Sequence, residues 1–177
     1  MPSRVQQSPK LDADTLSKLV NVFMRESDRA CAILGGELLN AELEALLNAA
    51  AVEPIDSRLL RGYGPLANFS SRIDLAFYFG LLSGEDRNDL HTVRDIRNLF
   101  AHRLDHNLSF DSVEVAEHIR KLQLPGVVAD HMGLIKGTID TSRMRFQIGV
   151  GLLSFVLRRV RMPNVGKSQV QAPFRIA

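Results

Sequence analysis

Apolar residues recur at helical spacing along most of this chain, and this pattern restricts its fold more than any other feature of the sequence. Leu16, Leu19, Val20 and Phe23 share one helical face, and the segment 26–50 is apolar almost all round its middle. Residues that favour helices dominate the middle of the chain, whereas strand signals are few. We therefore predict an all-α protein, a single-domain helical bundle of about six or seven helices. The expected helices span residues 12–23, 26–50, 70–79, 85–103, 112–122 and 141–161, and the type of structure at 127–138 is left open.

The length of 177 residues is enough for one domain with its own hydrophobic core. Residues 1–10 are polar, and we expect them to be disordered. Residues 11–162 form the expected helical domain. Pro163 ends the last helix, and residues 163–177 read as a flexible tail.

Composition argues against several classes of protein. The single cysteine, Cys31, rules out an internal disulfide, and its alanine-rich surroundings predict a buried small side chain rather than a nucleophile. The apolar stretch 148–157 is far shorter than the about 20 residues that cross a bilayer, and no signal peptide is visible. We therefore expect a cytoplasmic protein with no membrane contact. A formal net charge of +2 argues against DNA as its only partner.

Gly35 and Gly36 lie in the middle of a predicted helix, where each costs about 1 kcal/mol relative to alanine. The usual reason to keep glycine there is the close approach of another helix. We therefore predict a helix crossing at this pair.

The segment 90–104 carries an apolar stripe into which Arg97 falls. A buried arginine needs a carboxylate, because an unpaired buried charge costs several kcal/mol. We predict an ion pair between Arg97 and a carboxylate of another helix, either Asp28 or Asp74.

Four further polar residues, His91, Asp95, Asn98 and His102, lie on the flank of this stripe. Asn98 and His102 are four residues apart and can therefore touch. His91 and His102 lie too far apart for a compact metal-binding pair, and no cysteine joins them. We predict no metal site and no cofactor.

Four ordered blocks of this sequence resemble the mannitol operon repressor (MltR) family. They are ESDRACAILGGELL at 26–39, LRGYGPL at 60–66, FSSRIDLA at 69–76 and IRNLFAH at 96–102, and together they lie within residues 10–122. The residues that we take as a binding or structural polar cluster are Glu26, Asp28, Arg29, Arg72, Asp74, Arg97, Asn98 and His102.

The resemblance implies an all-helical bacterial protein tied to transcriptional repression of sugar-alcohol uptake genes. The sequence has no zinc-finger spacing and no basic region followed by a leucine zipper, and the link 104–111 is too long for a helix-turn-helix. We therefore expect a repressor-like regulator that acts through another regulatory protein or a transcription factor rather than by reading DNA directly. A homodimer is a further option for its surface.

An enzyme is the rival interpretation. Arg97, Asn98 and His102 are similar to the Arg-x4-6-His motif of HEPN ribonucleases, in which histidine could move a proton and arginine could hold a phosphate. On an ideal helix Arg97 and His102 lie about 140° apart, so they converge only by local fraying or across a dimer. We expect no catalytic activity, and a non-catalytic scaffold module remains the third interpretation.

The last predicted helix has basic ends on either side of an apolar run. A contact with nucleic acid or an anionic membrane is one interpretation, and a core or dimer helix with charged ends is the one that we favour. The basic residues are Arg143, Arg145, Arg158, Arg159 and Arg161.

Overall fold

The computed structural model describes residues 23, 25–103, 107–124 and 141–161. The helices are α2 (Asp28–Ala50), α3 (Ser57–Leu60), α4 (Phe69–Tyr78), α5 (Gly84–His102), α6 (Val113–Arg120) and α8 (Ser142–Arg161). The described residues contain no strand, which confirms the predicted all-α class. The helix expected at 12–23 and the segment 127–138 fall almost wholly outside the described residues.

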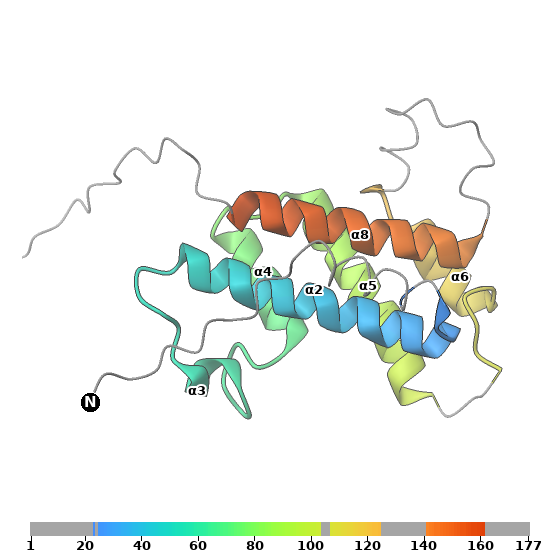
Figure 1. Cartoon of the computed structure of the whole chain (residues 1–177), viewed down its shortest axis with the longest axis horizontal. Helices are drawn as coiled ribbons and strands as arrows, with labels where there is room; N and C mark the ends of the chain where they lie inside the picture. Colours follow the sequence, from blue (N-terminus) through green and yellow to red (C-terminus); the bar gives the residue numbers. More distant parts are fainter. Residues whose placement is uncertain (1–22, 24, 104–106, 125–140, 162–177) are drawn as a thin grey trace, which may run out of the picture.

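Two long helices, α2 and α8, lie side by side and run in the same direction (Figure 1). At one end Asp28 pairs with Arg143, and at the other end Glu42 pairs with Arg158. The second layer is centred on α5, which contacts α2, α4, α6 and α8. α5 therefore holds the bundle together from beneath the α2–α8 pair.

Three phenylalanines run through the core and join segments that are far apart in the sequence. The ring centroids of Phe100 and Phe110 are 5.2 Å apart, and those of Phe110 and Phe146 are 5.0 Å apart. All three side chains are fully buried. Burial of a large apolar side chain stabilises a fold by about 2–3 kcal/mol, so this row contributes strongly to the joining of α5, α8 and the loop between α5 and α6.

Side-chain caps fix where the helices begin. Ser83 and Asp86 form a capping box at the start of α5, so this helix begins at Gly84, one residue before the expected start at residue 85. Asn68 caps α4 by accepting a hydrogen bond from the backbone N–H of Ser71, so this helix begins at Phe69, one residue before the expected start at residue 70. The α6 helix starts after Ser112, at Val113, one residue later than the expected start at residue 112.

A buried carboxylate, Asp89, ties α5 to the chain that follows α6. Its oxygens accept hydrogen bonds from the backbone N–H groups of Gln123 and Leu124 at 2.9 Å each. Desolvation raises the pKa of Asp89, although the two bonds oppose this effect.

The glycine pair lies at two helix crossings, as predicted. A Cβ atom on Gly35 would meet Phe146 and Val150 of α8 at 3.1 Å. A Cβ atom on Gly36 would meet the Cγ atom of Arg97 on α5 at 2.7 Å. The close packing of both α8 and α5 against α2 therefore requires glycine at these two positions.

Cys31 is buried among these helices. Burial raises the pKa of its thiol to about 11, so the group stays protonated near neutral pH. This agrees with the predicted structural role.

Among the described helices, none has the length and apolar character needed to cross a membrane.

Replacement of Gly36 by alanine should destabilise the fold. The new methyl group meets the stem of Arg97 close to its backbone, and such overpacking costs about 1–3 kcal/mol, partly offset by the better helix propensity of alanine. Gly151 lies in the exposed face of α8 with nothing within 4 Å of its added Cβ, so Gly151→Ala should stabilise by about 0.5–1 kcal/mol. Urea unfolding measures both, and a stabilised Gly36→Ala variant would contradict the crossing.

Candidate functional site

A cleft of about 600 Å³ opens between α2, α4 and α5. α2 supplies one wall, the start of α4 supplies the second, and the polar side of α5 supplies the third. The residues that line it are Glu37, Asn40, Ala67, Asn68, Phe69, Ser70, Arg94, Arg97 and Asn98. We call this hollow the α4–α5 cleft.

Arg97 lies in this cleft, and its predicted pairing with Asp28 or Asp74 is wrong. Its guanidinium donates to Glu37 at 2.5 Å and to the side chain of Asn98 at 3.0 Å. The stem of Arg97 crosses α2 over the bare backbone of Gly36, which brings the charged end to the neighbouring Glu37. A third of the Arg97 side chain stays exposed, so the residue is not sealed in the core.

Arg94 lies one helical turn before Arg97 on the same α5 wall of the cleft. It pairs with Asp95 at 2.6 Å and donates to the hydroxyl of Ser70 at 2.8 Å. One of its nitrogens also lies 2.9 Å from His91. These contacts hold the guanidinium against the first turn of α4.

Asp28 and Arg29 lie in the first turn of α2, away from the α4–α5 cleft, and bind neighbouring segments of the chain. Asp28 accepts hydrogen bonds from Arg143 at 2.6 Å and from the backbone N–H of Phe110 at 2.9 Å. Arg29 donates to the backbone oxygen of Arg103 at 2.8 Å and to that of Phe100, both near the end of α5. This is a structural clamp because its members satisfy backbone groups that the helices leave open.

The backbone oxygen of Glu26 belongs to the same clamp, since it accepts a hydrogen bond from Arg143. This contact uses the main chain of Glu26 and not its carboxylate.

Asp74 and Arg72 tie α4 to its neighbours. Asp74 pairs with Arg87 at 2.7 Å and contacts His91 at 3.1 Å, and the bond from Arg87 lowers the pKa of this carboxyl. Arg72 is only 3% exposed and donates to the backbone oxygens of Leu66 and Leu60. Arg72 therefore anchors the α3 region against α4.

His102 lines a second, shallower recess of about 420 Å³, and not the α4–α5 cleft. Asn98 borders both hollows, whereas Arg97 borders only the first. Within one chain the described structure therefore places Arg97 and His102 on different walls of α5, as their helical spacing indicated. The other residues of the recess are Asp95, Leu99, Arg103 and His118.

Of the eight residues of the predicted polar cluster, the α4–α5 cleft brings together only Arg97 and Asn98. The other members serve the α2 clamp, the anchor of α4 or the second recess. Sequence reasoning missed Glu37, Asn40, Asn68 and Arg94. The position of Arg94 three residues before Arg97 was the one signal that could have found it. The described residues contain no group of three or more side chains suited to hold a metal ion.

A second surface of interest lies on the solvent side of α8. Met144, Ile148, Gly151 and Phe155 follow a helical spacing that puts them on one face. Met144 is 38% exposed and Phe155 is 64% exposed. We call this set the α8 outer face, and Leu34 of the adjacent α2 is also exposed.

The basic ends of α8 are engaged within the fold. Arg158 and Arg161 pair with Glu42, and Arg145 donates to the backbone oxygens of Ile119 and Leu122. These contacts support the interpretation of α8 as a core helix with charged ends.

No family model and no curated protein matches the sequence. The fold is similar to that of a chain in the X-ray structure of the MtlR–HPr complex from Escherichia coli, with a TM-score of 0.61 and 17% sequence identity. The similarity covers 80% of this chain and 96% of that chain. The helical arrangement described above is therefore similar to the fold of that chain.

Asp28 and Glu37 should contribute different amounts to the free energy of unfolding. Asp28→Ala leaves the Phe110 N–H and the Arg143 guanidinium without this acceptor in a part-buried place, so we expect a loss of about 2–4 kcal/mol. Glu37 is half exposed, and Glu37→Ala should cost no more than about 1 kcal/mol. Urea unfolding of the two variants checks this, and equal losses would contradict the assignment of the clamp.

Proposed function

We propose that this chain is a repressor-like transcriptional regulator that acts by binding another protein and that has no catalytic activity of its own. The observation that carries the proposal is the α8 outer face. Soluble proteins rarely expose a contiguous apolar surface without a use for it, and aromatic and methionine side chains are enriched where proteins bind one another. Phe155 and Met144 are residues of this kind on the surface of a rigid helix.

The similar structure supports a protein as the binding partner. The solved complex contains MtlR together with HPr. A chain with the same fold can present its helices to a partner in a comparable way, so HPr is the first partner to test. The sequence blocks that resemble the mannitol operon repressor family support the same class of regulator.

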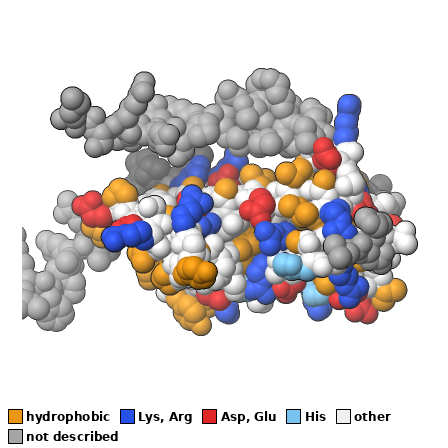
Figure 2. Space-filling model, turned by 90° about the horizontal axis from the view of Figure 1, so that it is seen from below, with side chains coloured by type: hydrophobic (Ala, Val, Ile, Leu, Met, Phe, Trp, Pro, Cys, Tyr) orange, Lys and Arg blue, Asp and Glu red, His pale blue; other side chains and the backbone are white. Residues whose placement is uncertain are grey.

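The charge distribution supports protein contact over direct reading of DNA. Most of the described arginines are ion-paired with carboxylates, as Arg103 is with Glu114 and Arg61 is with Glu44. Figure 2 shows acidic and basic side chains interspersed over the face seen from below. Binding to the phosphate backbone of DNA requires many cations gathered along one face, and here the arginines are interspersed with the carboxylates that pair with them.

The geometry of α5 supports a non-catalytic role. A ribonuclease would need the His102 imidazole and the Arg97 guanidinium around one phosphate. Arg97 is engaged by Glu37 in the α4–α5 cleft, whereas His102 borders the other recess.

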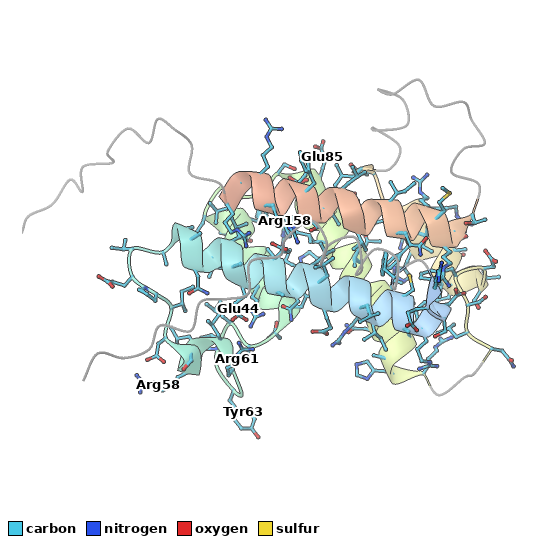
Figure 3. All side chains as sticks on the ribbon, in the orientation of Figure 1. Glu44, Arg58, Arg61, Tyr63, Glu85 and Arg158 are labelled. Carbon is cyan, nitrogen blue, oxygen red and sulfur yellow. The ribbon has the colours of Figure 1, made fainter. Side chains whose placement is uncertain are left out.

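Removal of the aromatic ring from the α8 outer face should weaken partner binding. We expect Phe155→Ser to raise the Kd for HPr of the same organism by about tenfold or more, because buried aromatic anchors dominate protein interfaces. Isothermal titration with purified HPr measures the constant. Tyr63→Ser is the matched control, since Tyr63 is fully exposed and points away from the helices (Figure 3).

An unchanged Kd in Phe155→Ser would contradict the α8 outer face as the binding surface. Absence of HPr binding, together with direct and sequence-specific binding of the operator near ~10⁻⁸ M, would contradict regulation through a protein partner.

Neither the wild-type protein nor His102→Ala should cleave RNA, because Arg97 and His102 face different hollows of one chain. The assay incubates both proteins with single-stranded and structured RNA and follows the products on a gel. Cleavage by the wild type that disappears in a correctly folded His102→Ala variant would make the protein an enzyme.

A further inference from the structure

We propose that the α4–α5 cleft is a binding site for a small phosphorylated metabolite, whose phosphate monoester contacts Arg94 and Arg97. This site lies beyond the proposed function and does not depend on it, because a small molecule can bind the purified chain without a protein partner.

The first argument is the spare hydrogen-bonding capacity of Arg97. A guanidinium carries five N–H donors. Among the described residues, Arg97 uses its two terminal nitrogens for one bond each, to Asn98 and to Glu37. Its Nε–H and the second hydrogen of each terminal nitrogen therefore remain for a ligand. The planar fork of arginine suits two oxygens of a phosphate.

Three asparagines add N–H donors to the same cleft. The amide oxygen of each already accepts a hydrogen bond within the protein, and the NH2 group remains as a donor. The oxygen of Asn40 accepts from Arg72, that of Asn68 accepts from the backbone of Ser71, and that of Asn98 accepts from Arg97. These bonds fix the orientation of each amide and leave its NH2 group without a partner among the described residues. The cleft thus presents a surplus of donors on all three of its walls.

The acceptors in the cleft are few by comparison. Glu37 is the only carboxylate among the lining residues, which also include the cationic Arg94 and Arg97. The side chains of the lining carry a formal charge of +1, from two arginines and one glutamate, and Asp95, which lies outside the lining, pairs with Arg94. The surplus that the cleft offers is therefore one of N–H donors, and a ligand that is rich in anionic oxygen acceptors complements it.

The dimensions favour a ligand larger than a bare ion. The cleft of about 600 Å³ lies within the range of about 300–1,000 Å³ that is usual for small-molecule sites. Phe69 provides an apolar element in its wall. A phosphate on the two arginines leaves the asparagine amides for hydroxyl groups on the rest of the molecule.

Glu37 gives the proposal its sharpest test, because it competes with the ligand for Arg97. A phosphate that binds the guanidinium must share it with this half-exposed carboxylate or displace it. Loss of the arginine and loss of the glutamate therefore have opposite effects on a ligand. A purely structural ion pair would give no such opposition.

The experiment is isothermal titration of the purified full-length protein with glycerol 3-phosphate, inorganic phosphate and glycerol. We expect saturable binding of glycerol 3-phosphate, weaker binding of inorganic phosphate and none of glycerol. Arg97→Gln and Arg94→Gln should each weaken binding by about tenfold or more. Glu37→Gln should tighten it by about threefold to fivefold.

Arg58→Gln is the matched control, since it removes the same charge from a side chain that is 88% exposed and lies beside α3, away from α2 and α8, in Figure 3. Thermal unfolding of each variant confirms that it folds. Absence of saturable binding by the wild type, or equal weakening in Arg58→Gln and Arg97→Gln, would overturn the site. Equally tight binding of inorganic phosphate and glycerol 3-phosphate would overturn the assignment to a metabolite.

Discussion

The arrangement of the bundle depends on two glycines of α2, because the lack of a Cβ atom at each lets a neighbouring helix approach closely. Gly35 lets α8 approach through Phe146 and Val150, and Gly36 lets the stem of Arg97 cross from α5. Because the two glycines are adjacent, their Cα atoms lie on different sides of α2, and a different helix packs closely against each side. The loss of helix propensity at both positions is offset by the contacts that the two neighbouring helices gain. The position of Arg97 in the α4–α5 cleft is a direct result of this packing.

Arginines link the helices of this protein in a way that differs from simple surface ion pairs. Arg29, Arg72 and Arg145 donate to backbone oxygens of segments far away in the sequence. Carbonyl groups at helix ends have no partner within their own helix, so a guanidinium with several donors can satisfy more than one of them. Charged residues here complete the backbone hydrogen bonding of the fold as well as its electrostatics.

The helical class, the crossing at Gly35 and Gly36 and the burial of Cys31 could be predicted from the sequence, since each follows from local spacing or from the chemistry of one residue type. The partner of Arg97 could not. A helical wheel gives the direction of a side chain from its own axis, but it gives neither the crossing angle of the neighbouring helix nor the distance that a long side chain spans. Asp28 and Asp74 were reasonable carboxylates, yet Arg143 and Arg87 reach them instead. Asn40 and Asn68 of the cleft were missed for a related reason, since one lies in α2 and the other caps α4, and together they form no motif in the sequence.

The parallel packing of α2 and α8 has a consequence for how the protein is made. Contacts between these helices join residues that are far apart in the sequence, such as Asp28 and Arg143, which are 115 positions apart. A ribosome releases α8 after all the other described helices, and until then the Gly35 side of α2 and the ring of Phe110 lack their covering partner Phe146. Contacts of such long range form slowly because a large loop must close first. The nascent chain therefore completes this core only once α8 has been made, and a chain that stops before residue 142 exposes apolar surface to chaperones and proteases.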